Sequence, residues 1–286
     1  MSVIVGTEGP DFLPGTSGDD SMLGLGGDDT LAPGGGRDTL DGGAGFDLAD
    51  YRDAADDLAV DLAAGRELNS DSELRDIEGV LGGAGDDLIR GDAGANWLHG
   101  GAGDDWLEGG AGNDTLLAGA GYDQLDGGAG EDLADYTDFA GRIEVNLAAG
   151  LAYGFDAGGA EIKVDQLTAI EHVSGGAGND TLIGDAGANW LYGEAGNDTL
   201  EGGGGADTLI GGAGADTFIF RTDYGVTVIQ DYEAGTDTFL LHGFDTFDVY
   251  LAGTGTDTFI DFGNGDGLYL VGILLEDIVY SDFIFS

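Results

Sequence analysis

Apolar side chains recur at a spacing of nine residues over three long stretches of the chain, and glycine or polar residues fill most positions between them. Five nonapeptides begin at Gly6, six at Gly82 and five at Gly175, which makes sixteen repeats. Position four is glycine in all of them, position six is Asp or Asn, and position eight is apolar, mostly leucine. A fixed period of this length indicates a repeat architecture.

Each nonapeptide predicts a turn followed by a very short strand. Glycine tolerates a positive φ, so the first six positions suit a turn. Positions seven to nine alternate outward, inward and outward, with the apolar side chain of position eight inside. Two nonapeptides then complete one coil, and residues 18 apart stack at one strand spacing, about 4.8 Å. We therefore expect an all-β fold, a parallel β-roll with an internal apolar ladder and acidic ladders along its edges.

Two similar segments interrupt the repeats. LAVDLAAG at 58–65 parallels IEVNLAAG at 143–150, and LRDIEGVL at 74–81 parallels LTAIEHVS at 167–174. Their alternating pattern predicts strands, so we expect extra coils with a loop. A solenoid also needs a cap over its last coil. The expected organisation is a first roll block at 1–50, an inserted segment at 51–81, a second block at 82–135, a second inserted segment at 136–174, a third block at 175–218 and a β-rich C-terminal cap at 219–286.

The charge of the chain makes cations necessary for a compact fold. The 56 acidic residues outnumber the 8 basic ones, and the net charge of −48 argues against nucleic acid or an anionic membrane as a partner. There is no cysteine and there are only three histidines, so a metal site must be built from oxygen atoms, which disfavours zinc and copper. Magnesium keeps its waters and requires octahedral geometry, whereas calcium accepts six to eight oxygens loosely. Composition therefore favours calcium.

At these nonapeptides the chain resembles the RTX (repeats-in-toxin) family, whose repeat G-G-x-G-x-D-x-U-x forms a calcium-binding parallel β-helix. The resemblance implies that each ion lies between two turns 18 residues apart, held by the position-six side chains of both turns and by carbonyls of the earlier glycines. Up to about ten Ca²⁺ sites are expected, the two with Asn being weaker. The candidate pairs are Asp11–Asp29, Asp29–Asp47, Asp20–Asp38, Asp87–Asp105, Asp105–Asp123, Asn96–Asp114, Asp114–Asp132, Asp180–Asp198, Asp198–Asp216 and Asn189–Asp207.

The sequences at the two ends of the chain bear on how the protein is exported. The stretch VIQDYEAGTDTFLLHGF at 228–244 resembles the region that follows RTX repeats in secreted bacterial proteases and epimerases. The final residues SDFIFS resemble a type I secretion signal, and the first residues lack the basic and apolar regions of a Sec-type signal peptide. No run approaches ~18 apolar residues, so no membrane insertion is expected. We expect a secreted, extracellular protein that uses type I secretion machinery.

The expected function is that of a secreted calcium-binding RTX repeat protein which folds on binding several Ca²⁺ ions and has a non-catalytic structural or adhesion-type role. Neither H-E-x-x-H nor G-x-S-x-G occurs, so we expect no enzymatic activity. The alternative is a calcium-dependent accessory or secretion module of an extracellular protease, lipase or polysaccharide epimerase. Trp97, Trp106 and Trp190 occupy position seven and should point outward. We favour packing against the inserted segments for Trp97 and Trp190, with a cell-surface or polysaccharide partner as the alternative.

Overall fold

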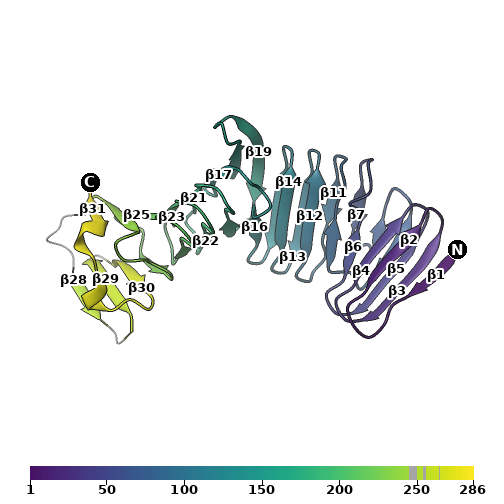
Figure 1. The fold of residues 1–286 in the computed structure, drawn as a ribbon, viewed down its shortest axis with the longest axis horizontal. Helices are drawn as coiled ribbons and strands as arrows, with labels where there is room; N and C mark the ends of the chain where they lie inside the picture. The colour runs from purple at the N-terminus through teal and green to yellow at the C-terminus, as the bar shows by residue number, and fades with distance from the viewer. Residues whose placement is uncertain (245–249, 254–255, 264) are drawn as a thin grey trace. The chain divides into compact units, whose positions relative to one another are not determined.

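The computed structural model describes residues 1–244, 250–253, 256–263 and 265–286, and it divides into two compact units. Unit 1 comprises Met1–Ala134 with Lys163–Ile170, and unit 2 comprises Asp135–Ile162 with Glu171–Ser286. Strands joined by tight turns make up both units (Figure 1). The helical elements of the described residues are short 3₁₀ turns, η2 (Leu275–Asp277) and η3 (Tyr280–Asp282), in and just after the region 273–280, where the sequence has helix-like spacing. The expected all-β fold is confirmed.

Unit 1 contains two parallel sheets whose strands alternate along the chain. Strand β12 pairs with β14 from Trp97↔Thr115 onward, and β13 pairs with β15 from Trp106↔Gln124 onward. Both registers are offset by two nonapeptides, which confirms the parallel β-roll. The strands are β1 (Ser2–Val5), β2 (Phe12–Thr16), β3 (Asp20–Gly26), β4 (Thr30–Gly34), β5 (Thr39–Ala44), β6 (Leu48–Asp50), β7 (Ala59–Asp61), β8 (Arg66–Glu67), β9 (Ser72–Arg75), β10 (Gly79–Leu81), β11 (Leu88–Arg90), β12 (Trp97–Ala102), β13 (Trp106–Ala111), β14 (Thr115–Ala120) and β15 (Gln124–Ala129).

The first interruption inserts a small antiparallel meander into one sheet of unit 1. Strand β8 pairs antiparallel with both β7 and β9. Strand β9 pairs parallel with β5, and β7 pairs parallel with β11. Meanwhile β10 continues the other sheet between β6 and β12. The segment thus keeps both sheets continuous although its residues leave the nine-residue period.

Unit 2 continues the same plan. Strand β17 pairs antiparallel with β18 and parallel with β21, after which β21, β23, β25, β27 and β31 follow one another in parallel. Strands β28, β29 and β30 form an antiparallel edge. The strands are β17 (Arg142–Asn146), β18 (Leu151–Phe155), β20 (His172–Ser174), β21 (Thr181–Ile183), β22 (Trp190–Tyr192), β23 (Thr199–Glu201), β24 (Thr208–Ile210), β25 (Thr217–Arg221), β26 (Val226–Ile229), β27 (Thr238–His242), β28 (Tyr250–Gly253), β29 (Thr258–Gly263), β30 (Asp266–Leu270) and β31 (Phe283–Phe285). Strands β16 (Leu133–Asp135) and β19 (Glu161–Thr168) each contribute residues to both units.

The core of each unit is the ladder of position-eight side chains. Leu98, Leu107 and Leu116 in unit 1 and Leu191 and Leu200 in unit 2 have no exposed surface. Full burial of one such side chain is worth about 1.5–3 kcal/mol relative to exposure. Position six lies two residues before position eight, and residues two apart along an extended chain face the same side, so the position-six side chains are carried inside as well.

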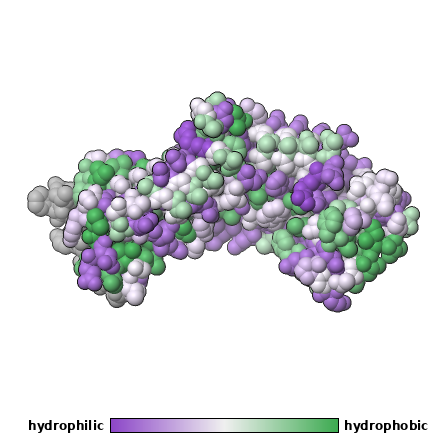
Figure 2. Space-filling view, in the orientation of Figure 1, coloured by the Kyte–Doolittle hydropathy of each residue, from purple (hydrophilic) through white to green (hydrophobic). Residues whose placement is uncertain are grey.

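The N-terminal coil of unit 1 exposes apolar side chains. Val3 and Val5 of β1 and Phe12 of β2 are 68%, 54% and 61% exposed. Figure 2 shows hydrophobic surface at this end of unit 1. These side chains are at outward-facing positions of the first coil, where Val3 pairs with Ser21, Val5 with Leu23 and Phe12 with Thr30.

Candidate metal centre

The position-six side chains are buried, which is unusual for acids. Fifteen of the sixteen candidates have at most 4% of their surface exposed, and Asp11 is half-buried. Their place in the chain explains this, because each lies two residues before a buried position-eight side chain. Asp20 is the first residue of β3, and each of the others directly precedes a strand. Burial of an ionised carboxylate is costly unless a positive charge or hydrogen bonds compensate it. So many buried carboxylates require a compensating partner.

The structure brings together all ten candidate pairs in one repeated geometry. In each pair the backbone N–H of the earlier residue donates to Oδ1 of the aspartate 18 residues later, at 2.7–3.0 Å. Asp105, for example, accepts from the Asp87 N–H, and its own N–H donates to Asp123. The carboxylates therefore form continuous ladders in which Oδ1 is held by the backbone.

The second oxygen, Oδ2, accepts a backbone N–H at Asp11, Asp20 and Asp87, but in most of the described ladder it lacks a donor. Within the described residues, eight buried Oδ2 atoms have no hydrogen-bond partner. Buried polar atoms are almost always hydrogen-bonded, so a repeated orphan of one atom type indicates a missing ligand. The eight belong to Asp29, Asp47, Asp105, Asp114, Asp180, Asp198, Asp207 and Asp216.

Glycine at position one makes room for these oxygens. A Cβ built on Gly24 would lie 2.2 Å from Oδ2 of Asp29 and 2.3 Å from the carbonyl oxygen of Gly42, one coil further on. At Gly109 the corresponding distances are 2.4 Å to Asp114 Oδ2 and 2.6 Å to a carbonyl of the next coil. A side chain at either of these positions would therefore displace a carboxylate oxygen and a carbonyl oxygen that flank the same space.

This donor set fits calcium. No three His, Cys, Asp or Glu side chains gather at one point in the part of the chain that the structure describes, so an ion here must rely largely on backbone carbonyls. Calcium takes six to eight oxygens at about 2.3–2.6 Å in flexible geometry and accepts backbone carbonyls readily. Zinc prefers nitrogen and sulfur ligands in a tetrahedral arrangement. The carboxylate and carbonyl oxygens between adjacent turns are suited to the harder ion.

Burial also changes the proton affinity of the ladder. Desolvation raises the pKa of Asp105 and Asp198 to about 7, with the neighbouring ladder carboxylates adding to the effect. Desolvation likewise raises the pKa of Asp114, Asp180 and Asp207 to about 6. Protons near neutral pH therefore compete with any cation for these oxygens.

Three ladder members lie outside the nonapeptides and were missed from the sequence. Glu78 accepts the Asp47 N–H at 2.9 Å, Asp165 accepts the Asp123 N–H at 3.1 Å, and Asp237 accepts the Asp216 N–H at 3.0 Å. Asp237 lies in GTDTF, which keeps the glycine, acid and apolar spacing of positions four, six and eight. An acid two residues before an apolar strand residue was therefore the signal to follow.

A second, exposed ladder at position five was also missed. The backbone N–H of Phe46 donates to Asp28, that of Tyr122 to Asp104 and that of Ala215 to Asn197, each pair being 18 residues apart at 2.8–3.0 Å. Here the later residue donates to the earlier side chain, the reverse of the position-six ladder. These contacts join successive coils at the surface by hydrogen bonds alone.

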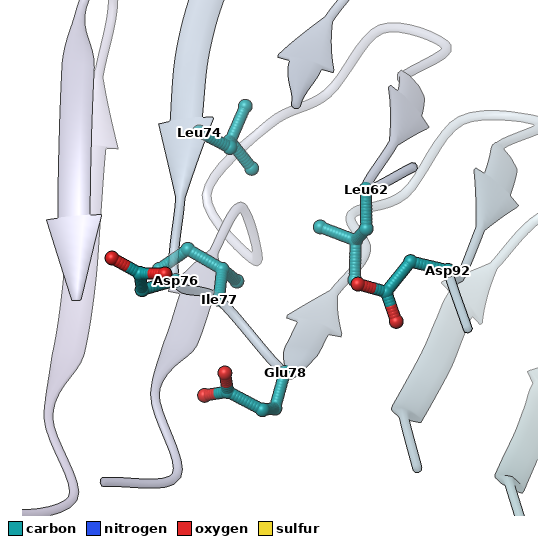
Figure 3. Close-up of a pocket in the computed structure, with 6 residues that line it drawn as sticks. All are labelled: Leu62, Leu74, Asp76, Ile77, Glu78 and Asp92. Carbon is teal, nitrogen blue, oxygen red and sulfur yellow. The ribbon is translucent and has the colours of Figure 1, made fainter. Parts of the chain in front are cut away.

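An acidic pocket of about 130 Å³ lies in unit 1 where the first interruption rejoins the repeats. Figure 3 shows three carboxylates around it together with three apolar side chains. Desolvation raises the pKa of one of them, Glu78. The carboxylates do not gather at a single point, and we assign no ion to the pocket. Its lining consists of Leu62, Leu74, Asp76, Ile77, Glu78 and Asp92.

The outward tryptophans stand beside histidines. Trp97 lies 5.9 Å from His99 between ring centroids, and Trp190 lies 6.4 Å from His172. His172 lies near the end of the second inserted segment, so Trp190 packs against that segment as expected. Trp106 and Trp190 remain 43% and 40% exposed.

Among the described residues, none of the helices has the length and apolar character needed to cross a membrane.

The repeats that form this geometry match a family model. The family model of the RTX calcium-binding nonapeptide repeat, which holds four copies, matches residues 3–31, 14–49, 81–116, 108–136, 169–200 and 183–218, more than half of the chain. No curated protein matches. A solved structure, the extracellular lipase LipA from Serratia marcescens, is similar at 22% identity and a TM-score of 0.30, covering 77% of this chain and 42% of that one, so this chain spans less than half of the lipase. The matched repeats are the ones that carry the buried carboxylate ladders, and the chain belongs to the RTX calcium-binding nonapeptide repeat family.

Proposed function

We propose that this chain is a secreted calcium-binding repeat protein whose roll folds when Ca²⁺ enters the intervals between turns 18 residues apart, and that its role is structural or adhesive rather than catalytic. The observation that carries the proposal is the set of eight buried Oδ2 atoms without a donor in the described residues. Bound calcium would supply the positive charge that these oxygens lack.

Backbone groups position the aspartates and also contribute to the proposed calcium sites. Backbone N–H groups hold Oδ1 of ladder aspartates such as Asp105 and Asp114, whose Oδ2 lies beside the position-one glycine of the same repeat. A carbonyl of the next coil closes the same space. Asp105 and Asp114 each belong to two successive intervals, so filling one interval orders a ligand of the next. Binding should therefore be cooperative along the roll.

The two asparagines reduce the need for a cation. Oδ1 of Asn96 accepts the Asp92 N–H at 2.7 Å, and its Nδ2 donates to the Glu78 carbonyl at 3.2 Å. Asn189 repeats this arrangement with Asp185 and Glu171 at 2.8 and 2.9 Å. The amide is neutral and already paired, so these two intervals should bind calcium most weakly.

Coupled folding suits export. In a cytosol with little calcium, the ladders would repel one another and the chain would stay unfolded, as passage through a type I export channel requires. Extracellular calcium modules typically bind with dissociation constants of about 10⁻⁴–10⁻³ M, which matches the higher calcium outside the cell. Binding free energy would then become folding free energy.

A far-UV circular dichroism titration tests the proposal. At pH 7.5 the metal-free chain is expected to lack most of its β signal and to gain it cooperatively as calcium rises through about 10⁻⁴–10⁻³ M. Magnesium at the same concentrations is expected to have little effect, because it holds its waters and prefers rigid octahedral sites. A chain that is fully β without calcium and unmoved by a chelator would refute coupled folding.

A further inference from the structure

One ladder continues into the second interruption. Gln124 of β15 pairs with Gln166 of β19, so Asp165 occupies the position-six place of the next coil although it lies 42 residues after Asp123. The Asp123 N–H donates to Asp165 Oδ1 at 3.1 Å, as in the regular pairs. Asp165 has no exposed surface. Asp123–Asp165 is thus one more ladder interval, built across an interruption.

This interval already contains a cation. Nζ of Lys163 lies 3.0 Å from Asp123 Oδ2 and 3.0 Å from Asp165 Oδ2. It also donates to the carbonyl oxygen of Gly119 at 2.6 Å. Two position-six carboxylates and a carbonyl from the glycine turn are the same kinds of donor that surround the proposed calcium intervals. The Lys163 side chain is 2% exposed, so the ion pairs are buried.

The sequence around the interval departs from the repeat in matching ways. Lys163 is the only lysine among the 286 residues, and the other seven basic residues are arginines. Position one of the Asp123 repeat is Ala118, where most repeats have glycine. In the preceding coil a Cβ on Gly100 would lie 2.3 Å from Asp105 Oδ2, so a methyl group is incompatible with that carboxylate placement. Ala118, which carries this methyl group, and Asp123, whose carboxylate pairs with Lys163, belong to the same repeat.

The first interruption continues the ladder with a different group. There the Asp38 N–H donates to Oγ of Ser72, a neutral group, at 2.8 Å. Position one of the Asp38 repeat is Pro33, the other departure from glycine. The two interruptions match in sequence at 58–65 with 143–150 and at 74–81 with 167–174. A lysine between two carboxylates is therefore no general requirement of an interrupted coil, but a specific feature of the second one.

We propose that Lys163 is a built-in cation that stands where calcium would stand, so that the Asp123–Asp165 interval holds residues 163–170 on unit 1 without a metal ion. This rests on the proposed calcium function of the other intervals. The physical advantage lies in chain length. Closing a loop of 42 residues costs more conformational entropy than closing one of 18. Lys163 belongs to the incoming segment itself. It can therefore close this interval without a calcium ion whenever there is enough calcium for the coils on either side to fold.

Counting bound calcium tests this inference. Lys163→Ala should vacate the interval and leave two carboxylates facing each other, so the folded variant should bind one more calcium ion per chain than the wild type. The matched double variant Lys163→Ala with Asp165→Asn removes one of these carboxylates and should return the count to the wild-type value. A folded Lys163→Ala variant with an unchanged count would overturn the inference. A wild type that binds no calcium would instead overturn the proposed function.

The unmodified protein provides a test that does not depend on the variants folding. Because the chain has a single lysine, an amine-reactive acetylating reagent can modify only Lys163 and the N-terminal α-amino group. In the calcium-saturated protein, Lys163 should react at least about a hundredfold more slowly than in the denatured chain, since reaction requires breaking the buried pair. The α-amino group is the internal reference. Equal rates for Lys163 in the folded and denatured protein would contradict the buried ammonium.

Discussion

Replacing Asp105 by Asn is expected to raise the calcium concentration for half-maximal folding about tenfold, which corresponds to about 1.4 kcal/mol. The amide keeps the size of the side chain and keeps an Oδ1 that can accept the Asp87 N–H. The substitution removes the negative charge from Asp105, whose Oδ2 has no donor in the described residues. Asp105 also belongs to two successive intervals, so both lose a charged ligand. The effect should therefore come from calcium affinity and leave the backbone ladder intact. A calcium titration followed by circular dichroism measures it.

Asp104→Asn is the matched control for this substitution. Asp104 is the adjacent residue and also accepts a backbone N–H across one coil, from Tyr122 at 3.0 Å. It is exposed, however, and stands in the position-five ladder. Loss of an exposed charge is typically worth less than about 1 kcal/mol, so its midpoint should shift only slightly. Equal shifts for the two variants would mean that calcium responds to net charge rather than to the buried ladder.

Acidification is expected to restore structure to the metal-free chain. In the fold, the pKa is about 7 for Asp105 and Asp198 and about 6 for Asp114, Asp180 and Asp207, against about 3.9 for an unfolded aspartate. A raised pKa means that the folded chain binds more protons than the unfolded one. Its stabilising contribution is complete below the unfolded pKa and is lost as the pH rises through about 6–7.

The measurement is circular dichroism of protein freed of metal by dialysis, at pH 8 and at about pH 5. More β structure at the lower pH is the expected result. With limiting calcium the order should reverse, because protons and calcium compete for the same oxygens. A metal-free chain with the same signal at both pH values would show that the buried carboxylates are not what prevents folding.

The regular part of the roll could be predicted from the sequence because a strict period fixes both register and facing. Once Leu98, Leu107 and Leu116 are placed inside, the residues two positions earlier must stack with their counterparts 18 residues away, and the ten pairs follow. The reason for glycine at position one was only half foreseen. The family resemblance implied that glycine carbonyls hold the ion, while the structure shows that position-one glycine also leaves room for Oδ2 of its own repeat.

The interruptions could not be predicted in the same way. Asp165 and Glu78 reach the ladder after 42 and 31 residues, distances set by how the inserted strands fold back. No periodicity encodes such a distance. Lys163 was missed for the same reason, since its role depends on two carboxylates that the sequence separates widely.

Calcium is expected to lie between turns 18 residues apart, against the buried position-six oxygens. Crystals grown with calcium, and diffraction data that record the anomalous signal of the ion, test this directly. We expect peaks beside Oδ2 of ladder aspartates such as Asp105 and Asp114, each near a position-one carbonyl of the next coil, and no peak at the Lys163 ammonium. Peaks confined to exposed position-five acids such as Asp104, with none between the buried carboxylates, would contradict it.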